Sequence, residues 1–287
     1  MICANQRTVN GRTHNFNAEA AVLCGKLQLP FVHVIEPQSY TTLPAEGGCF
    51  ANRQEIYRLD GFMHFSAGYT HVAGSLSPKP NHGWTTLVTT VIEGLNVEEI
   101  VTADRIVGQI ITEHPLEGYV PRINFLGTRF ENLRIAGFPV QLEIDLNLLS
   151  GKPANDAPYT EDAGVLARIK GHLDRVGEHK ELPADLRERY NRLVSAHGPA
   201  MEEIECSLVK SVSGTFPGTS HGNVISIPDF GSIVLAKVIV KHEDYKRGTN
   251  IPRKTTVELT MIDFHLGCPA DGTMGAGVGS GGGSSVP

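Results

Sequence analysis

The most constraining feature of the sequence is a short pattern that occurs three times. Ile92–Ile100 alternates apolar and other residues, breaks at a two-residue polar step and then becomes apolar again. The same order is found at Phe130–Phe138 and, in shorter form, at Ile225–Phe230. Side chains on a β-strand alternate between two faces, and short steps of Gly, Asn, Asp or Pro reverse an extended chain. The pattern therefore predicts repeated antiparallel hairpins.

Repeated hairpins indicate a mainly β protein, an antiparallel β-sandwich or a related β-rich body. Residues 1–150 are expected to form its N-terminal part, and residues 201–269 are expected to complete it with further hairpins. A chain of 287 residues is long enough for such a body to bury a core. The segment Thr41–Asn52 contains a proline and two consecutive glycines, so it is expected to be a loop.

The apolar period changes from two to the helical value between residues 151 and 200. After a proline-containing linker, Thr160 and the two acidic residues that follow it are typical of a helix start. Apolar residues then recur every three or four positions. A second helical pattern begins at Pro183 and ends near Gly198. These residues predict an αα-hairpin inserted between the two β parts.

Residues 270–287 are dominated by glycine and serine. A segment of this composition has few side chains whose burial offsets the entropy lost on ordering. We therefore expect a flexible Gly/Ser tail.

The charge and the cysteines limit the classes of function. The formal net charge is −6 at pH 7, which argues against nucleic-acid binding, because that affinity comes largely from Lys and Arg contacts to phosphates. No apolar run approaches the roughly 20 residues that span a bilayer, and no secretory signal pattern is visible. The five cysteines are dispersed without a C-x-x-C pair, which favours reduced thiols. A protein without a membrane span, cytoplasmic by default, is expected.

Three of the twelve histidines are candidate metal ligands, namely His64, His71 and His82. Neutral imidazole is a common metal ligand, and these residues are close in sequence. His64 and His71 are seven positions apart, so on one continuous strand they would point to opposite faces. They converge only if the chain turns between them. The plainer explanation is that they occupy sheet faces and loops.

Candidate catalytic residues are His71, Ser220, His221 and Asp229. Ser220-His221 places a nucleophile beside a base, and Asp229 is the available third member of a Ser–His–Asp arrangement. Adjacent residues seldom orient both side chains correctly, and hairpin loops use Ser and Gly for turn geometry. Gly218-Thr219-Ser220-His221-Gly222 has the letters of a Gly-x-Ser-x-Gly motif, but it is interpreted as a hairpin loop and not as the nucleophile elbow of a serine hydrolase.

Pairs of carboxylates are a further candidate for acid–base catalysis. Glu93 and Glu131 hold equivalent places in the first two hairpin patterns, and Glu143 and Asp145 share one face of a strand. Glycosidases use two such acids at a defined separation. Charges that oppose unwanted strand pairing explain the repeated glutamate equally well.

Aromatic residues supply candidate ligand platforms. Tyr57, Tyr69 and Trp84, with Phe65, offer apolar surfaces for a small molecule or a glycan. A lone tryptophan after a loop is more commonly a core residue. The glycine-rich segment lacks Lys-Ser/Thr and is not followed by a helical pattern, so it is interpreted neither as a P-loop nor as a dinucleotide-binding fingerprint, and no cofactor is predicted.

The leading hypothesis is a non-catalytic structural or interaction protein that self-associates as a homo-oligomer through β-edge or sheet-face contacts. It rests on the repeated hairpins, on the long alternating strands, whose edges must be paired, covered or blunted, and on the absence of a recognisable catalytic constellation. The alternatives are a hydrolase or metal-dependent enzyme that uses loop histidines, and a small-molecule or glycan-binding module.

Overall fold

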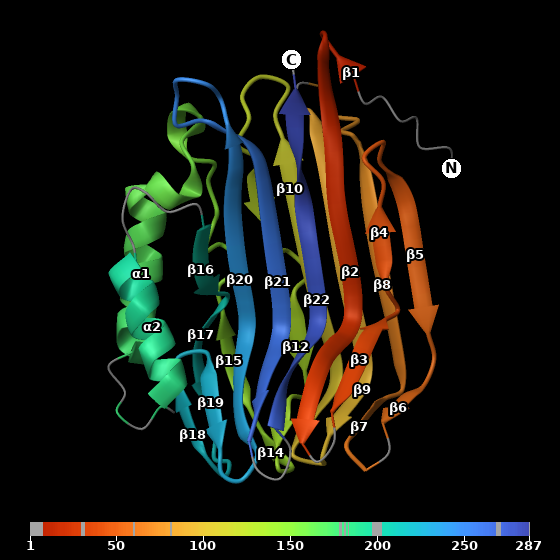
Figure 1. The fold of residues 1–287 in the computed structure, drawn as a ribbon, viewed down its shortest axis with the longest axis vertical. Coiled ribbons are helices and arrows are strands. Elements are labelled where there is room, and N and C mark those ends of the chain that lie inside the picture. The colour runs from red at the N-terminus through yellow and green to blue at the C-terminus, as the bar shows by residue number, and fades with distance from the viewer. Residues whose placement is uncertain are drawn as a thin grey trace.

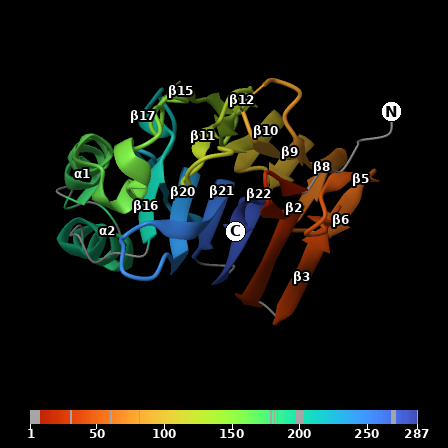
Figure 2. The same cartoon turned by 90° about the horizontal axis from the view of Figure 1, so that it is seen from above.

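Two antiparallel sheets pack face to face, and two helices lie at one side of them (Figures 1 and 2). This computed structural model describes residues 8–29, 32–59, 61–80, 82–177, 180, 182, 184–196, 203–267 and 271–286. The predicted mainly β fold with a two-helix insertion is confirmed.

The first sheet, sheet A, joins strands from both ends of the chain. Its strand order is β1–β2–β22–β21–β20–β19–β18, with β3 and β4 paired to β2 and β16 paired to β20. The strands are β1 (Thr8–Val9), β2 (Arg12–Leu29), β3 (His33–Gln38), β4 (Thr41–Leu43), β16 (Glu203–Ser207), β18 (Thr219–His221), β19 (Val224–Ile227), β20 (Gly231–Tyr245), β21 (Pro252–Leu266) and β22 (Asp271–Val286).

The second sheet, sheet B, comes from one continuous region. Its order is β14–β13–β10–β9–β7–β6, with β8 paired to β9, β5 to β8, and β11 and β12 to β10. The strands are β5 (Gly48–Gln54), β6 (Tyr57–Leu59), β7 (Met63–Phe65), β8 (Ala67–Leu76), β9 (Trp84–Val97), β10 (Val101–His114), β11 (Arg122–Asn124), β12 (Arg129–Glu131), β13 (Arg134–Ile135) and β14 (Phe138–Pro139). A small third sheet pairs β15 (Gln141–Ile144) with β17 (Val209–Ser213).

All three sequence patterns fall on hairpin turns. The chain reverses at Glu98-Glu99 between β9 and β10, at Ala136-Gly137 between β13 and β14, and at Pro228-Asp229 between β19 and β20. Each turn contains at least one residue with a positive φ, as tight hairpin turns require. The strands before these turns differ in length, since β9 has 14 residues and β13 has two. The three turns are therefore hairpin turns, whereas a repeated hairpin unit stays a prediction.

The Gly/Ser segment is not a flexible tail. β22 lies between β2 and β21 and is paired with both along its length (Figure 1, dark blue). Gly279 and Gly281 are required by the close approach of sheet B, because a Cβ on Gly281 would lie 2.8 Å from Val88 Cγ2 and one on Gly279 would lie 2.9 Å from Val88 Cγ1. Backbone hydrogen bonds on both sides stabilise a strand whose composition alone predicted disorder.

The segment Thr41–Asn52 corrects a second expectation, because most of it is extended. β4 pairs with β2 in sheet A, and β5 pairs with β8 in sheet B. The proline and the two glycines of this segment accompany the crossing of the chain from one sheet to the other.

The helices are α1 (Ala163–Gly177) and α2 (Ala184–Ala196). They pack at the side of the sandwich next to β16 (Figures 1 and 2). The helix cap is Asp162, whose Oδ1 accepts a hydrogen bond from the Val165 N–H at 2.8 Å. Thr160 lies instead in a short 3-10 helix, Tyr159–Glu161, and a similar turn is found at Ala154–Asp156. In the described part of the chain, neither helix has the length and apolarity to cross a bilayer.

Candidate interaction site on the open flank

The side of the sandwich opposite the helices is formed by β3, β5 and β6 (Figures 1 and 2, orange). Among the described residues, β3 has only β2 as a strand partner and β5 has only β8. We define the open flank as residues 26–29 and 32–59. Unlike the opposite side, it is not covered by α1 or α2.

Exposed apolar side chains concentrate on the open flank. Ten large hydrophobic side chains are exposed in the described part of the chain, and six of them belong to this flank. Val32 is 72% exposed and Ile56 is 71% exposed. The six are Leu29, Val32, Val34, Tyr40, Phe50 and Ile56. Gathered exposed apolar groups are typical of interaction surfaces, whereas single ones are ordinary.

The open flank carries no net formal charge. Its basic side chains are Lys26, Arg53 and Arg58, and its acidic side chains are Glu36, Glu46 and Glu55. The whole chain has a net charge of −6. Two copies that approach through this flank therefore avoid the like-charge repulsion that acts between the molecules as a whole.

Both edge strands of the flank resist direct extension of a sheet. β3 contains Pro37, which has no N–H to donate. Beside β5, Ser39 Oγ donates to the carbonyl oxygen of Asn52 at 3.0 Å, and Asn52 Nδ2 donates to the carbonyl oxygen of Tyr40 at 3.1 Å. These contacts occupy part of the β5 edge, so packing of side chains is favoured over strand addition.

His71 contacts the thiol of Cys49 on this flank. The His71 Nε2 atom lies 3.1 Å from Cys49 Sγ, and the register that pairs β5 with β8 brings the two residues together. Sequence reasoning missed Cys49 because no local spacing connects it to His71. The contact joins a thiol to a base, and it depends on strand register alone.

The three histidines proposed as metal ligands do not converge. His64 pairs with Asn96 and His71 with Thr89. These partners are seven positions apart on β9, about 23 Å at the usual rise of about 3.3 Å per residue. His82 lies beside Glu113, with Nδ1 4.0 Å from Oε2. Within the described ranges, no three His, Cys, Asp or Glu side chains form a group suited to a metal ion.

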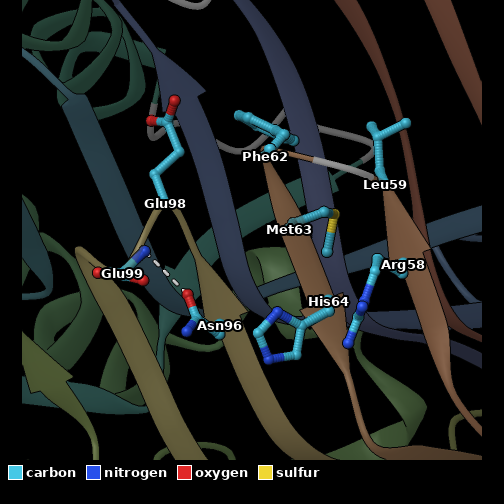
Figure 3. A pocket seen from close by; sticks show the side chains of 9 residues that line it. Arg58, Leu59, Phe62, Met63, His64, Asn96, Glu98 and Glu99 are labelled. Atoms are coloured by element: carbon cyan, nitrogen blue, oxygen red, sulfur yellow. Dashed lines mark hydrogen bonds between the residues drawn. The ribbon is translucent and has the colours of Figure 1, made fainter.

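His64 lines an open pocket of 480 Å³ between the β6–β7 and β9–β10 turns (Figure 3). The Glu98 N–H donates to the carbonyl oxygen of Phe62 at 2.7 Å, which fixes the two turns together. Burial raises the pKa of the Glu98 carboxyl group. The carboxylate of Glu98 points away from the imidazole of His64 (Figure 3). The two groups are therefore not arranged to contact the same ligand atom.

The Ser–His–Asp arrangement receives no support from the geometry. Ser220 and His221 are consecutive residues of β18, so their side chains point to opposite faces. Ser220 Oγ donates to the carbonyl oxygen of Val212 at 3.4 Å, and His221 is buried. Asp229 lies in the turn between β19 and β20 with a φ of +60°.

The paired carboxylates are engaged in structural contacts. Glu93 and Glu131 lie on strands either side of β10, and each is opposite Arg105 in the register. Arg105 Nε is 3.6 Å from Glu93 Oε1, while Arg129 Nε is 2.7 Å from Glu131 Oε1. This row of alternating charges stabilises neighbouring strands.

The second pair of carboxylates, Glu143 and Asp145, also makes structural contacts. Glu143 Oε2 accepts a hydrogen bond from Ser211 Oγ at 3.0 Å, and Asp145 Oδ2 lies 3.2 Å from Lys210 Nζ. Neither carboxylate has the isolated, desolvated environment that suits a general acid.

The aromatic candidates do not form one platform. Trp84 is fully buried and stacks on His14 with ring centroids 5.1 Å apart, which corrects its assignment as a ligand surface. Tyr57 stacks on the buried Phe65, with centroids 5.5 Å apart. The Tyr69 hydroxyl accepts a hydrogen bond from Arg105 Nη2 at 2.9 Å.

Comparison with known proteins places the chain in a family without assigning it an activity. No curated protein and no solved structure matches the chain. A family described as "Domain of unknown function (DUF8256)" matches residues 14–241, from β2 into β20. The sandwich itself continues past the matched region, since β21 and β22 complete sheet A. The chain belongs to the family described as Domain of unknown function (DUF8256).

Proposed function

We propose that the protein is a non-catalytic structural or interaction protein that self-associates, with two copies in contact through the open flank. The observation that carries this proposal is the gathering of six of the ten exposed large hydrophobic side chains of the described residues on one uncovered side. Burial of apolar surface is the main favourable contribution to most protein association.

Charge and edge structure support a second copy as the partner. The flank is neutral while the chain is acidic, so a like molecule meets the least repulsion there. Because Pro37 and the Ser39–Asn52 contact obstruct the strand edges, the contact is expected to be made by side chains such as Val34 and Ile56.

The test is the oligomeric state of purified protein across the micromolar range, measured by sedimentation equilibrium and mass photometry. Wild-type protein is expected to form a dimer. The substitutions Val34→Glu and Ile56→Glu place a charge in the proposed contact and are expected to weaken dimerisation at least tenfold, since a buried unpaired charge is costly.

Leu126→Glu is the matched control. Leu126 is 57% exposed and lies between β11 and β12, outside the open flank. This variant is expected to dimerise like the wild type, with circular dichroism confirming that all three variants are folded. A wild-type protein that stays monomeric throughout, or folded flank variants that dimerise normally, would refute the proposal.

A further inference from the structure

A cavity of 250 Å³ lies between α1 and the strands β16 and β17. The elements that line it, α1, β16 and β17, lie on the helical side of the sandwich, opposite the open flank (Figure 1). Its lining combines residues from the segment after β15, from α1 and from the β16–β17 region. They are Asp145, Leu148, Arg168, Ile169, His172, Cys206, Ser207 and Lys210.

The inner wall of the cavity is buried and offers mainly apolar contact. Leu148, Ile169 and Cys206 are each at most 6% exposed. Burial raises the pKa of the Cys206 thiol, so this wall residue is uncharged at neutral pH. Ser207 Oγ already donates to the carbonyl oxygen of Leu235 at 2.8 Å, and His172 Nε2 lies 3.0 Å from Asn223 Oδ1.

The mouth of the cavity carries an excess of positive charge. Arg168 donates from both Nε and Nη2 to the carbonyl oxygen of Leu148, at 3.2 and 3.1 Å, which holds the guanidinium group in place. Lys210 Nζ lies 3.2 Å from Asp145 Oδ2, and its side chain is 46% exposed. Two cations and one carboxylate leave one positive charge for an anionic group.

We propose that this cavity binds a medium-chain aliphatic carboxylate, with the chain between α1 and β16 and the carboxylate at Arg168 and Lys210. A water-sized group takes about 30 Å³, so the cavity holds roughly eight such groups. An apolar interior with a few polar groups at the opening is typical of small-molecule sites. This inference does not depend on dimerisation through the open flank.

The first experiment compares three probes of equal chain length by isothermal titration calorimetry. Octanoate is expected to bind, 1-octanol is expected to bind at least tenfold more weakly, and octylammonium is expected to show no binding. Octylammonium binding as tightly as octanoate, or absence of octanoate binding up to its solubility, would overturn the proposal.

Variants that remove a positive charge test whether Arg168 and Lys210 bind the carboxylate at the cavity mouth. Arg168→Gln and Lys210→Gln are each expected to weaken octanoate binding at least threefold while leaving 1-octanol unaffected. Lys170→Gln removes an exposed cation from the same helix outside the cavity lining, and is expected to bind octanoate like the wild type. Equal effects of all three substitutions would indicate non-specific attraction and contradict the assignment.

A volume change tests the interior independently of charge. Cys206→Met adds two heavy atoms to the side chain at the cavity wall, so the preferred ligand is expected to shift from octanoate toward hexanoate. Cys49→Met, at an exposed cysteine on the open flank, is the control and is expected to keep the wild-type preference. An unchanged preference in folded Cys206→Met protein would show that the ligand binds elsewhere.

Discussion

His242 accepts a hydrogen bond from the backbone N–H of Tyr159, with Nε2 2.9 Å from the amide nitrogen. The other ring nitrogen, Nδ1, lies 3.1 Å from Thr255 Oγ1 and carries the hydrogen of the neutral ring. This contact ties the segment before α1 to β20 and β21. It requires a neutral imidazole, because a protonated Nε2 has no lone pair to accept the Tyr159 hydrogen.

The stability of the protein is therefore expected to fall in mild acid. Burial lowers the pKa of His242 to about 4 and that of His114 to about 3, from the ordinary histidine value of 6.5. Below pH 6.5 the unfolded chain binds more protons than the folded protein, so the free energy of unfolding decreases as pH falls toward these values. At pH 5 the loss is about 2 kcal/mol for each ring.

Urea unfolding at pH 7 and pH 5 measures this loss. His242→Gln is expected to be less stable at pH 7 but to lose about 2 kcal/mol less between the two pH values. A variant with the full wild-type pH dependence would show that His242 does not titrate as described.

Gly281→Ala is expected to destabilise the sandwich by about 1–3 kcal/mol, because the added Cβ overlaps Val88. The companion change Val88→Ala removes the obstructing methyl groups, so the double variant is expected to be more stable than the sum of the two single effects implies. Urea unfolding of the four proteins gives this coupling. Ser280→Ala, at the neighbouring less buried position, serves as the control; strictly additive effects would rule out the close contact.

Asp162→Ala is expected to cost about 1 kcal/mol of unfolding free energy, because the Val165 N–H loses its capping acceptor. Glu188→Ala removes a carboxylate from an exposed position within α2 and is expected to change stability by less than about 0.5 kcal/mol. Chemical denaturation of the two variants compares them directly. Equal losses would mean that Asp162 does not act as a cap.

Trp84 is the single tryptophan and is fully buried against His14. Its fluorescence is expected to have a short-wavelength maximum, with little quenching by acrylamide, and to shift to longer wavelength on unfolding. Strong acrylamide quenching in the folded protein would contradict the burial of Trp84 and would make it a candidate ligand-binding surface again.

The described cysteines are expected to differ in reactivity. Cys49 is exposed, whereas burial raises the pKa of the thiols of Cys24 and Cys206. Because the thiolate is the reactive form, iodoacetamide at pH 8 is expected to label Cys49 at least tenfold faster than Cys206. Peptide mass spectrometry measures the rates, and labelling in urea should remove the difference. Similar rates in the folded protein would contradict the burial of Cys206.

Local sequence patterns were sufficient to predict several elements of the fold. The turn at Glu98-Glu99 and the apolar alternation around it identified the β9–β10 hairpin, because both signals lie within a few residues. The helical spacing before Gly177 identified α1 in the same way. The start of α1 was misplaced at Thr160 because Asp162 is an equally good cap in sequence, and only the hydrogen bond to Val165 distinguishes them.

The candidate sites were less accessible to sequence reasoning. The Cys49–His71 contact follows from the pairing of β5 with β8, and the cavity beside Ile169 follows from the position of α1 against β16. The open flank was also hidden, because exposure of Val32 and Ile56 depends on which side of the sandwich the helices cover.

The sequence by itself determined that this protein is built of antiparallel hairpins with a helical insertion, because strand and helix periods and turn residues act over short distances. Only the tertiary structure decided that the glycine-rich end is a central strand. Its stability comes from hydrogen bonds to β2 and β21 and from the close approach of Val88, none of which its own residues encode. The composition of a segment indicates only how stable its own side chains can make it. A strand that lies between two others is stabilised in addition by contacts with those neighbours.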